Sequence, residues 1–284
     1  MHRFMNSLKT VIFLGLLFGI VLAIGSIWGK QGIIMAFFIG GMMNVVAYFF
    51  SDKIALSMMH AQQVDAKTAP DLVTMVERLS QNAGLPMPKV YICPQEAPNA
   101  FATGRNPHNA AVAVTQGALR LLSYDELEGV MAHELAHVKN RDTLISCVAA
   151  TIAGAINAIG YMFMFAGSSG NNREGGHPIL ALLMIILAPI AAAMIQMAIS
   201  RSREYMADHD AAYMTGTPAG LISALQKLDA YARRIPLHGE AATYNHIFIV
   251  QPLSATGGDR LFSTHPSTAN RIKKLQEIGA EMRA

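Results

Sequence analysis

The sequence predicts a mainly α membrane protein, with four transmembrane helices and a cytoplasmic α+β domain that contains a small sheet. The first observation behind this fold class is composition, since hydrophobic residues make up 52% of the 284 residues and charged residues only 14%. An ordinary soluble domain has about 45–50% apolar and about 25% charged residues. Part of this chain is therefore expected to lie in lipid.

Four apolar segments are the second observation. Each is close to the roughly 20 residues that a helix needs to cross about 30 Å of hydrocarbon. They are residues 11–28, 33–50, 143–166 and 179–199. No small-residue cleavage site follows the first, so it is interpreted as a retained anchor, paired with the second through a tight loop at residues 29–32. The last two segments are interrupted by Asn157, Pro189 and Gln196. The alternative for these two segments is therefore a buried hairpin of a soluble domain.

Positive residues border the segments on one side, which is the third observation. They are Arg3, Lys9, Lys53, Lys139, Arg141, Arg201 and Arg203. The opposite loops carry only Lys30 and Arg173. Because positive flanks stay in the cytoplasm, both termini and the polar blocks are expected there.

The predicted division of the chain follows from these segments. Residues 1–52 form a first membrane hairpin and residues 143–199 a second one, while 53–142 and 200–284 fold together into the cytoplasmic domain. In this domain, "PDLVTMVERLSQNAGLP" has the apolar spacing of a helix that ends at Gly84 and Pro86. "KVYIC" and "AAVAVTQGAL" are typical of short strands, and further helices are expected near 219–233 and 267–279.

Charge and cysteine content exclude several classes of protein. The formal net charge is only +3 and no basic run is interleaved with aromatic residues, so a nucleic-acid partner is not expected. Cys93 and Cys147 lie far apart in the sequence, which provides neither a disulfide framework nor a CxxC metal site.

The stretch "GVMAHELAHVKNRD" at residues 129–142 carries the strongest chemical signal. Ser123 and Glu126 form a capping-box pattern that predicts a helix starting there, which is expected to continue towards the third segment through Lys139 and Arg141. His133 and His137 then lie one turn apart and can bind Zn²⁺ at about 2.0–2.1 Å, with Glu134 beside the metal as the acceptor of a proton from bound water. The alternative is an incidental pair of surface histidines.

A catalytic zinc also needs a third protein ligand and an open position for water. "SRSREYMADHDAAYMTG" supplies Glu204 as this ligand and Asp208, one turn later, as the carboxylate that orients a liganding histidine. His209 is the rival ligand, but on a helix it projects about 100° away from Asp208. The alternative is that Glu204 and Asp208 belong to a solvated helix face together with Arg201 and Arg203.

These motifs, together with "FSTHPSTANRI", "NAFATG" and "HIFIVQPL", resemble the HtpX family of bacterial heat-shock membrane metalloproteases, relatives of the CAAX prenyl proteases. The resemblance covers nearly the whole chain. It implies a zincin-type metalloprotease domain with one Zn²⁺ per chain, bound by His133, His137 and Glu204, with Glu134 as catalytic residue and Asp208 behind a ligand. It also implies a multi-pass protein of the bacterial inner membrane that cleaves misfolded or damaged membrane proteins on the cytoplasmic side, as part of the stress response.

Two further roles are hypotheses from the sequence. His265, fixed before Pro266, is a candidate donor to the oxyanion of the reaction, whereas Arg271 is either that donor or the residue that holds a carboxylate of the site. The alternative for His265 is a cap or packing residue. "NAFATG", which opens at Asn99, and the strand with Ala111 and Ala113 are the expected sheet edge for an extended substrate, unless both strands are internal.

The expected function is therefore that of a zinc metalloendopeptidase at the surface of the lipid bilayer, with a homo-oligomer left open. An intramembrane protease would carry the motif inside an apolar segment, and here "SYDELEG" and "KNRD" bracket it. A transporter would carry charges within its spans. The remaining alternative is a non-catalytic zinc-binding membrane scaffold or chaperone.

Overall fold

The computed structural model describes residues 29–144, 201–234 and 266–283, with single positions between 8 and 26. Residues 145–200 and 235–265 lie outside this description. They include most of the third apolar segment, all of the fourth, Cys147 and His265. The predictions made for these residues are therefore neither confirmed nor corrected by the fold.

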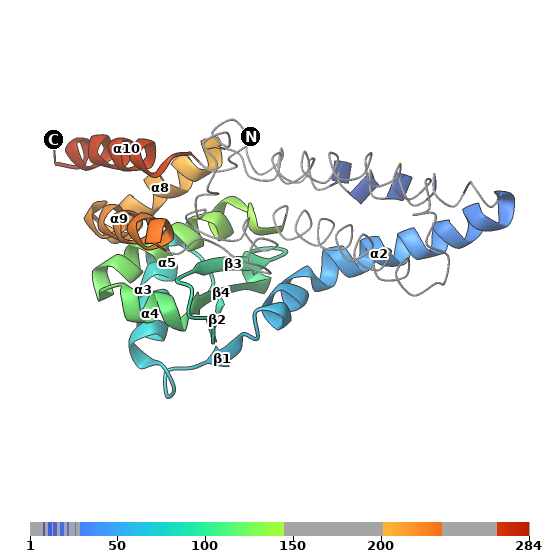
Figure 1. Cartoon of the computed structure of the whole chain (residues 1–284), viewed down its shortest axis with the longest axis horizontal. Coiled ribbons are helices and arrows are strands. Elements are labelled where there is room, and N and C mark those ends of the chain that lie inside the picture. The colour runs from blue at the N-terminus through green and yellow to red at the C-terminus, as the bar shows by residue number, and fades with distance from the viewer. Residues whose placement is uncertain are drawn as a thin grey trace, which may run out of the picture.

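A long apolar helix, α2 (Gly29–Met58), extends away from the described strands and the helices packed on them (Figure 1). Its most apolar window has a mean hydropathy of 2.0, and among the described residues it is the one helix long and apolar enough to cross a membrane. Residues 29–32 are its first turn, so the expected loop is absent. The helix also continues past the predicted boundary at residue 52, and its last turns reach the folded domain.

A four-stranded sheet forms the centre of that domain. Its strands are β1 (Gln62–Val64), β2 (Lys89–Cys93), β3 (Ala100–Gly104) and β4 (Ala110–Thr115), in the spatial order β1-β2-β4-β3. β2 and β4 are parallel, and the other two pairs are antiparallel. The strand predicted from "AAVAVTQGAL" ends at Thr115, whose hydroxyl accepts a hydrogen bond from the backbone N–H of Ala118 and starts the short helix α4 (Gln116–Leu121).

The strand order corrects one prediction about substrate binding. β4 lies between β2 and β3, and Ala111 and Ala113 are paired on both sides and buried. Their assignment to an open sheet edge is therefore wrong, because their backbone groups are already used in the sheet. β3, which carries "AFATG", is one of the two edge strands among the described strands, and β1 is the other.

Helices cover the sheet and extend the domain. The main ones are α3 (Pro70–Ala83), α5 (Tyr124–Asn140), α8 (Arg201–Thr215), α9 (Ala219–Arg234) and α10 (Thr268–Glu281). A 3₁₀ turn at Pro107–Asn109 lies between β3 and β4. The capping box of Ser123 and Glu126 is present at the start of α5, as predicted. Gly84 ends α3 in the left-handed conformation, and Ser267 caps α10. The expectation that the α5 helix continues through Arg141 is wrong, because it ends at Asn140.

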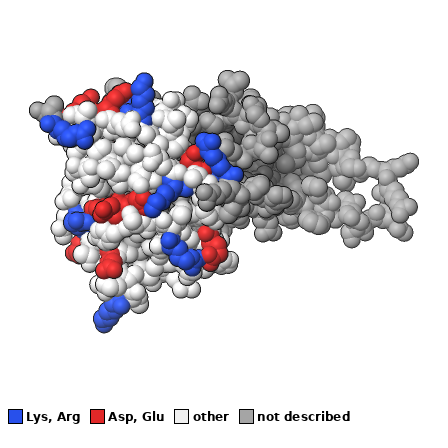
Figure 2. All heavy atoms as spheres, turned by 60° about the vertical axis from the view of Figure 1, so that its left-hand side comes forward, with Lys and Arg blue, Asp and Glu red and all other residues white. Residues whose placement is uncertain are grey.

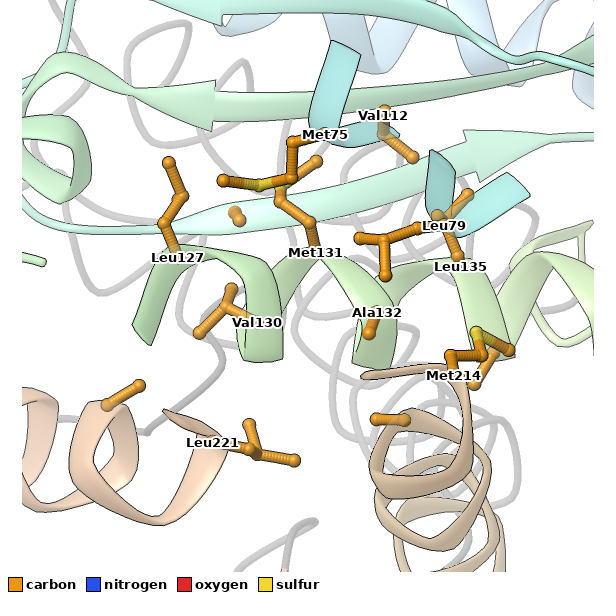
Figure 3. Close-up of a cluster of buried hydrophobic side chains, with 14 of the residues drawn as sticks. Met75, Leu79, Val112, Leu127, Val130, Met131, Ala132, Leu135, Met214 and Leu221 are labelled. Atoms are coloured by element: carbon orange, nitrogen blue, oxygen red, sulfur yellow. The ribbon is translucent and has the colours of Figure 1, made fainter. Parts of the chain in front are cut away.

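The two faces of the sheet pack against different elements. One face contacts α3 and α5 through a core that includes Met75, Leu79, Val112, Val114, Met131 and Leu135. The other face holds the end of α2, where Leu56 and Met59 pack against Phe101, Ala111 and Ala113. Figure 3 shows α5 between the sheet on one side and the helices that carry Met214 and Leu221 on the other. α2 is thus joined to the sheet, and α5 is the central helix of the domain.

The crossing of α5 and α9 depends on two glycines. A Cβ on Gly129 would lie 2.5 Å from the backbone nitrogen of Leu221, and a Cβ on Gly220 would lie even closer to the carbonyl oxygen of Asp125. Neither neighbour is a side chain that could rotate away. The two helices therefore approach each other backbone to backbone, one turn before His133.

Charged side chains are scattered over the surface of the domain. Figure 2 shows small groups in which basic and acidic residues lie side by side, and uncharged areas separate one group from the next. Arg78 and Glu128 form one such surface pair, with 2.7 Å between Nη2 and Oε1. The charge that bears on function is instead buried around α5.

Candidate metal centre

Three side chains from two helices converge in the interior of the domain. His133 and His137 come from one face of α5, and Glu204 comes from the first turn of α8. The two Nε2 atoms are 3.2 Å apart, and carboxylate oxygens of Glu204 lie 3.5 Å from that of His133 and 3.6 Å from that of His137. Ligands of a tetrahedral zinc with bonds of about 2.0–2.1 Å are separated by about 3.3–3.4 Å. The two nitrogens and the Glu204 carboxylate, through Oε2 towards His133 and Oε1 towards His137, therefore have the spacing of zinc ligands.

The three side chains are not equally buried, and His137 is the most exposed of them. The side chains of His133 and Glu204 are 3% and 6% exposed, whereas that of His137 is 17% exposed. Solvent therefore reaches the cluster from the His137 side. Among the described residues, this is the one group of three histidine, cysteine or acidic side chains that has the spacing of a metal site.

Asp208 lies behind His133, as the sequence predicts. Its Oδ1 is 3.0 Å from Nδ1 of His133, and because an ionised carboxylate can only accept, Nδ1 donates and Nε2 faces the cluster with its lone pair. Arg271 on α10 donates to both oxygens of Asp208, over 2.9 Å from Nε and 2.6 Å from Nη2. Of the two roles predicted for Arg271, the geometry matches the one that holds a carboxylate.

Asp142 stands behind His137 in the same way, a role that was not predicted from the sequence. Its Oδ2 is 3.2 Å from Nδ1 of His137, and its side chain is 5% exposed. The only sequence signal was an acidic residue shortly after the second histidine. That signal is weak, because the chain must turn back at the end of α5 before Asp142 can reach His137.

Glu134 is next to the two histidines on α5 and is also buried. Its Oε2 accepts a hydrogen bond of 3.0 Å from the backbone N–H of Ala102 on β3. Burial raises the pKa of Glu134, which is the direction that suits a residue accepting protons near neutral pH. The carboxylate is thus held between the helix and the sheet edge.

The charges around the cluster favour a cation. The buried carboxylates are Asp142, Glu134, Glu204 and Asp208, against two buried guanidinium groups, Arg203 and Arg271. Burial and the charge of Arg271 oppose protonation of His133, but hydrogen bonds to Asp208 and Glu204 outweigh them and raise its pKa to about 9. The site therefore attracts a positive charge, either as a proton or as a metal ion.

Other residues singled out in the sequence lie elsewhere. His209 is half exposed, with Nδ1 3.6 Å from Asp210, and its ring contacts Tyr213. Asn99 is buried at the start of β3, where its backbone N–H donates to the hydroxyl of Thr115 over 2.9 Å. Cys93 is buried against the end of α2, and burial raises the pKa of its thiol to about 11, so it is a poor nucleophile.

Fold and site together define a class of protein. Two histidines and a glutamate of a His-Glu-x-x-His helix, a second helix with a further glutamate, and an adjacent edge strand are the arrangement of a metallopeptidase. The chain belongs to peptidase family M48, whose sequence pattern matches residues 66–279.

Similar proteins agree with this assignment. The chain is 50% identical to a protease HtpX homolog of Methylibium petroleiphilum over 279 residues, which cover 96% of this chain and 98% of that protein. It is also 50% identical to one of Sulfurihydrogenibium sp., covering 98% of this chain and 97% of the relative. The resemblance to the HtpX family is therefore confirmed.

A solved structure with a similar fold is the crystal structure of S. mikatae Ste24p. It superposes with a TM-score of 0.53 at 18% sequence identity, over 96% of this chain and 66% of that chain. At this level of identity the likeness concerns the fold alone.

Proposed function

We propose that this family M48 peptidase is a zinc-dependent, membrane-anchored endopeptidase with one Zn²⁺ per chain, bound by His133, His137 and Glu204. The observation that carries the proposal is the spacing of 3.2 to 3.6 Å between the two Nε2 atoms and between each of them and a carboxylate oxygen of Glu204, in a buried site with an excess of carboxylates. Zinc, when bound there, supplies a Lewis acid and a water of lowered pKa.

The chain's own residues account for the remaining steps. Glu134 accepts the proton of the attacking water and passes it to the leaving nitrogen of the peptide. Asp208, fixed by Arg271, keeps Nε2 of His133 directed at the site. No covalent intermediate is involved, since water is the nucleophile.

The edge strand β3 is the proposed place for substrate. The N–H of Ala102 points away from β4 towards Glu134, so the outer edge of β3 runs beside the catalytic carboxylate. An extended peptide that pairs with this edge would be held by its main chain, which tolerates many side-chain sequences. Such tolerance suits the substrates we propose, misfolded or damaged membrane proteins.

The proposed setting is a bacterial inner membrane. α2 has the length and composition of a membrane span, and its exposed apolar residues include Ile34, Met35, Phe38 and Met42. We further propose four spans with both termini in the cytoplasm. A cysteine at Ser169 should then react with an impermeant reagent from the outer side, and a C-terminal reporter should be cytoplasmic. Labelling of Ser169→Cys only from the cytoplasmic face would instead support the alternative that the third and fourth apolar segments form a soluble hairpin.

The central experiment compares three forms of the full chain in detergent: wild type, Glu134→Gln and Glu128→Gln. Glu128 is the matched control, because it lies on the same helix but pairs with Arg78 at the surface. We expect about one zinc per chain in all three and casein cleavage only by wild type and Glu128→Gln. Cleavage by Glu134→Gln would refute the mechanism. Zinc without cleavage by wild type would favour the scaffold or chaperone.

His265 remains the proposed donor to the oxyanion, six positions before Arg271 in the sequence. Losing such a donor costs about 10²–10³ in kcat. His265→Ala should therefore retain its zinc and its KM while losing most of its kcat, and His209→Ala, at an exposed residue away from the site, should behave as wild type. Wild-type kcat in His265→Ala would remove His265 from the mechanism.

A further inference from the structure

Both histidines of the site have a buried carboxylate at Nδ1, but only one of these carboxylates is foreseen by the sequence motifs. Asp208 serves His133 over 3.0 Å, and Asp142 serves His137 over 3.2 Å. We propose that Asp142, held by Arg203, is a positioning residue that orients His137 for metal binding. This inference rests on the proposed zinc site and adds to it a residue that ends the stretch at residues 129–142 but has no role in the His-Glu-x-x-His pattern.

The end of α5 explains how Asp142 reaches His137. Arg141 adopts the left-handed conformation, with φ 58°. The N–H of Asp142 donates to the carbonyl of His137 over 2.9 Å, and the N–H of Arg141 donates to that of Val138 over 3.1 Å. These two bonds form a Schellman motif, which reverses the chain at the helix end. Asp142 is therefore tied to His137 by its backbone as well as by its side chain.

The contact settles which nitrogen of His137 can bind a metal. The carboxylate of Asp142 accepts from Nδ1–H, so the lone pair lies on Nε2, the atom 3.2 Å from Nε2 of His133. His137 needs this tie more than His133 does, because its side chain is 17% exposed and has less packing to fix its rotamer. A liganding histidine commonly depends on such a partner for orientation.

Arg203 forms a buried ion pair with Asp142 that is longer than the hydrogen-bonded pair of Arg271 and Asp208. Its Nη1 lies 3.8 Å from Oδ1 of Asp142, and both side chains are buried, at 7% and 5% exposure. Arg203 directly precedes Glu204 on α8, so the pair joins the end of the histidine helix to the start of the helix with the third ligand. The same buried charge thus supports ligands on both helices.

A purely structural role for Asp142, as a clamp between α5 and α8, is the rival explanation, and Asp210 provides the control. Asp210 also bridges these helices, since its Oδ2 accepts from Asn140 over 3.2 Å and lies 3.8 Å from Nζ of Lys139. Unlike Asp142, it is not paired with either histidine of the site. A clamp would make the two carboxylates equivalent, whereas a positioning role makes only Asp142 affect the metal.

The test measures zinc affinity by chelator competition, and the absorption of the Co²⁺-substituted protein, in the full chain. Asp142→Ala should weaken zinc binding about 10–100-fold, similar to Asp208→Ala. Asp142→Asn, which keeps size and one acceptor oxygen, should weaken it less and still shift the cobalt bands. Asp210→Asn should leave affinity and bands unchanged. Wild-type affinity and bands in both Asp142 variants would overturn the proposal.

A double-mutant cycle tests the part played by Arg203. Arg203→Met should weaken zinc binding in the wild type but have a smaller effect once Asp142 is alanine, because the two act through one contact. Fully additive effects would remove Arg203 from the proposal. Failure of the proposed function would be distinct from either result, since the wild type itself would then bind no zinc.

Discussion

Arg271 and Asp208 are joined by two parallel hydrogen bonds, although they lie 63 residues apart in the sequence. Both side chains are fully buried, at 2% and 0% exposure. The guanidinium presents its planar fork to the carboxylate, a geometry that lysine cannot reproduce. Through this contact the last helix of the chain controls the orientation of His133 on α5.

The first prediction concerns that pair. Arg271→Met leaves Asp208 buried without its main partner, which should cost about 3–5 kcal/mol of stability. Arg271→Lys keeps the charge but loses the second bond, so its loss of stability and of zinc affinity should be intermediate. Thermal unfolding and chelator competition would measure both. Lys274→Ala, at an exposed residue of the same helix, is the control and should change neither.

The second prediction uses the sheet edge. Ala102→Pro removes the N–H that donates a hydrogen bond to Glu134. It removes no hydrogen bond within the sheet, because this N–H points away from β4. We expect the variant to fold, to retain zinc and to lose most of its peptidase activity. Proline at Ala113, on the central strand, should instead prevent folding. Equal activity of Ala102→Pro and wild type would show that the outer edge of β3 does not bind the substrate.

Local sequence signals predicted the helices well, because their ends are fixed by nearby residues. Ser123 with Glu126 starts α5, and Gly84 ends α3, as their types and spacing indicate. The loop expected at residues 29–32 rested on two glycines, but glycine only weakly opposes a helix in an apolar setting where backbone groups need internal partners.

Features that depend on distant contacts were not predictable in the same way. The order of the strands depends on the parallel pairing of β2 with β4, which places Ala113 inside the sheet, and alternation along one strand carries no information about its neighbours. Asp142 was missed because its role requires Arg141 in a left-handed conformation, which is rare for a residue other than glycine. Glu204 and Asp208 were found because their spacing places both on one helix face.

The third prediction concerns the helix crossing at Gly129. A methyl group there meets the backbone of Leu221, so Gly129→Ala should separate α5 from α9 and cost about 1–3 kcal/mol. Gly220→Ala should have a similar effect, because it meets the backbone of Asp125. In thermal unfolding these losses correspond to about 2–4 °C per kcal/mol. Gly41→Ala is the control, since no described atom would contact its added methyl group. An unchanged Tm for both core variants would contradict the close crossing.

The last prediction concerns pH and Glu126, which joins the start of α5 to α9. Its carboxylate accepts from Nζ of Lys227 over 2.7 Å, from Oγ of Ser223 over 2.6 Å and from the N–H of Ser123 over 2.8 Å. Burial alone would raise the pKa of Glu126, but the hydrogen bonds from Lys227 and Ser223 outweigh burial and lower it from 4.5 to about 2.

A pKa lowered by folding means that the ionised form stabilises the folded state. This contribution is fully present above pH 4.5, the ordinary pKa, and disappears as the pH falls to about 2. Glu126→Gln should therefore cost about 1.5–3 kcal/mol of stability at pH 7, the net contribution of a hydrogen bond to a charged group.

The Tm of Glu126→Gln should approach that of wild type between pH 4.5 and pH 3, with both proteins measured free of metal. Glu128→Gln, at a surface ion pair, should cost less than about 1 kcal/mol at pH 7. A Tm difference between Glu126→Gln and wild type that stayed constant from pH 7 to pH 3 would show that the charge of Glu126 does not stabilise this junction.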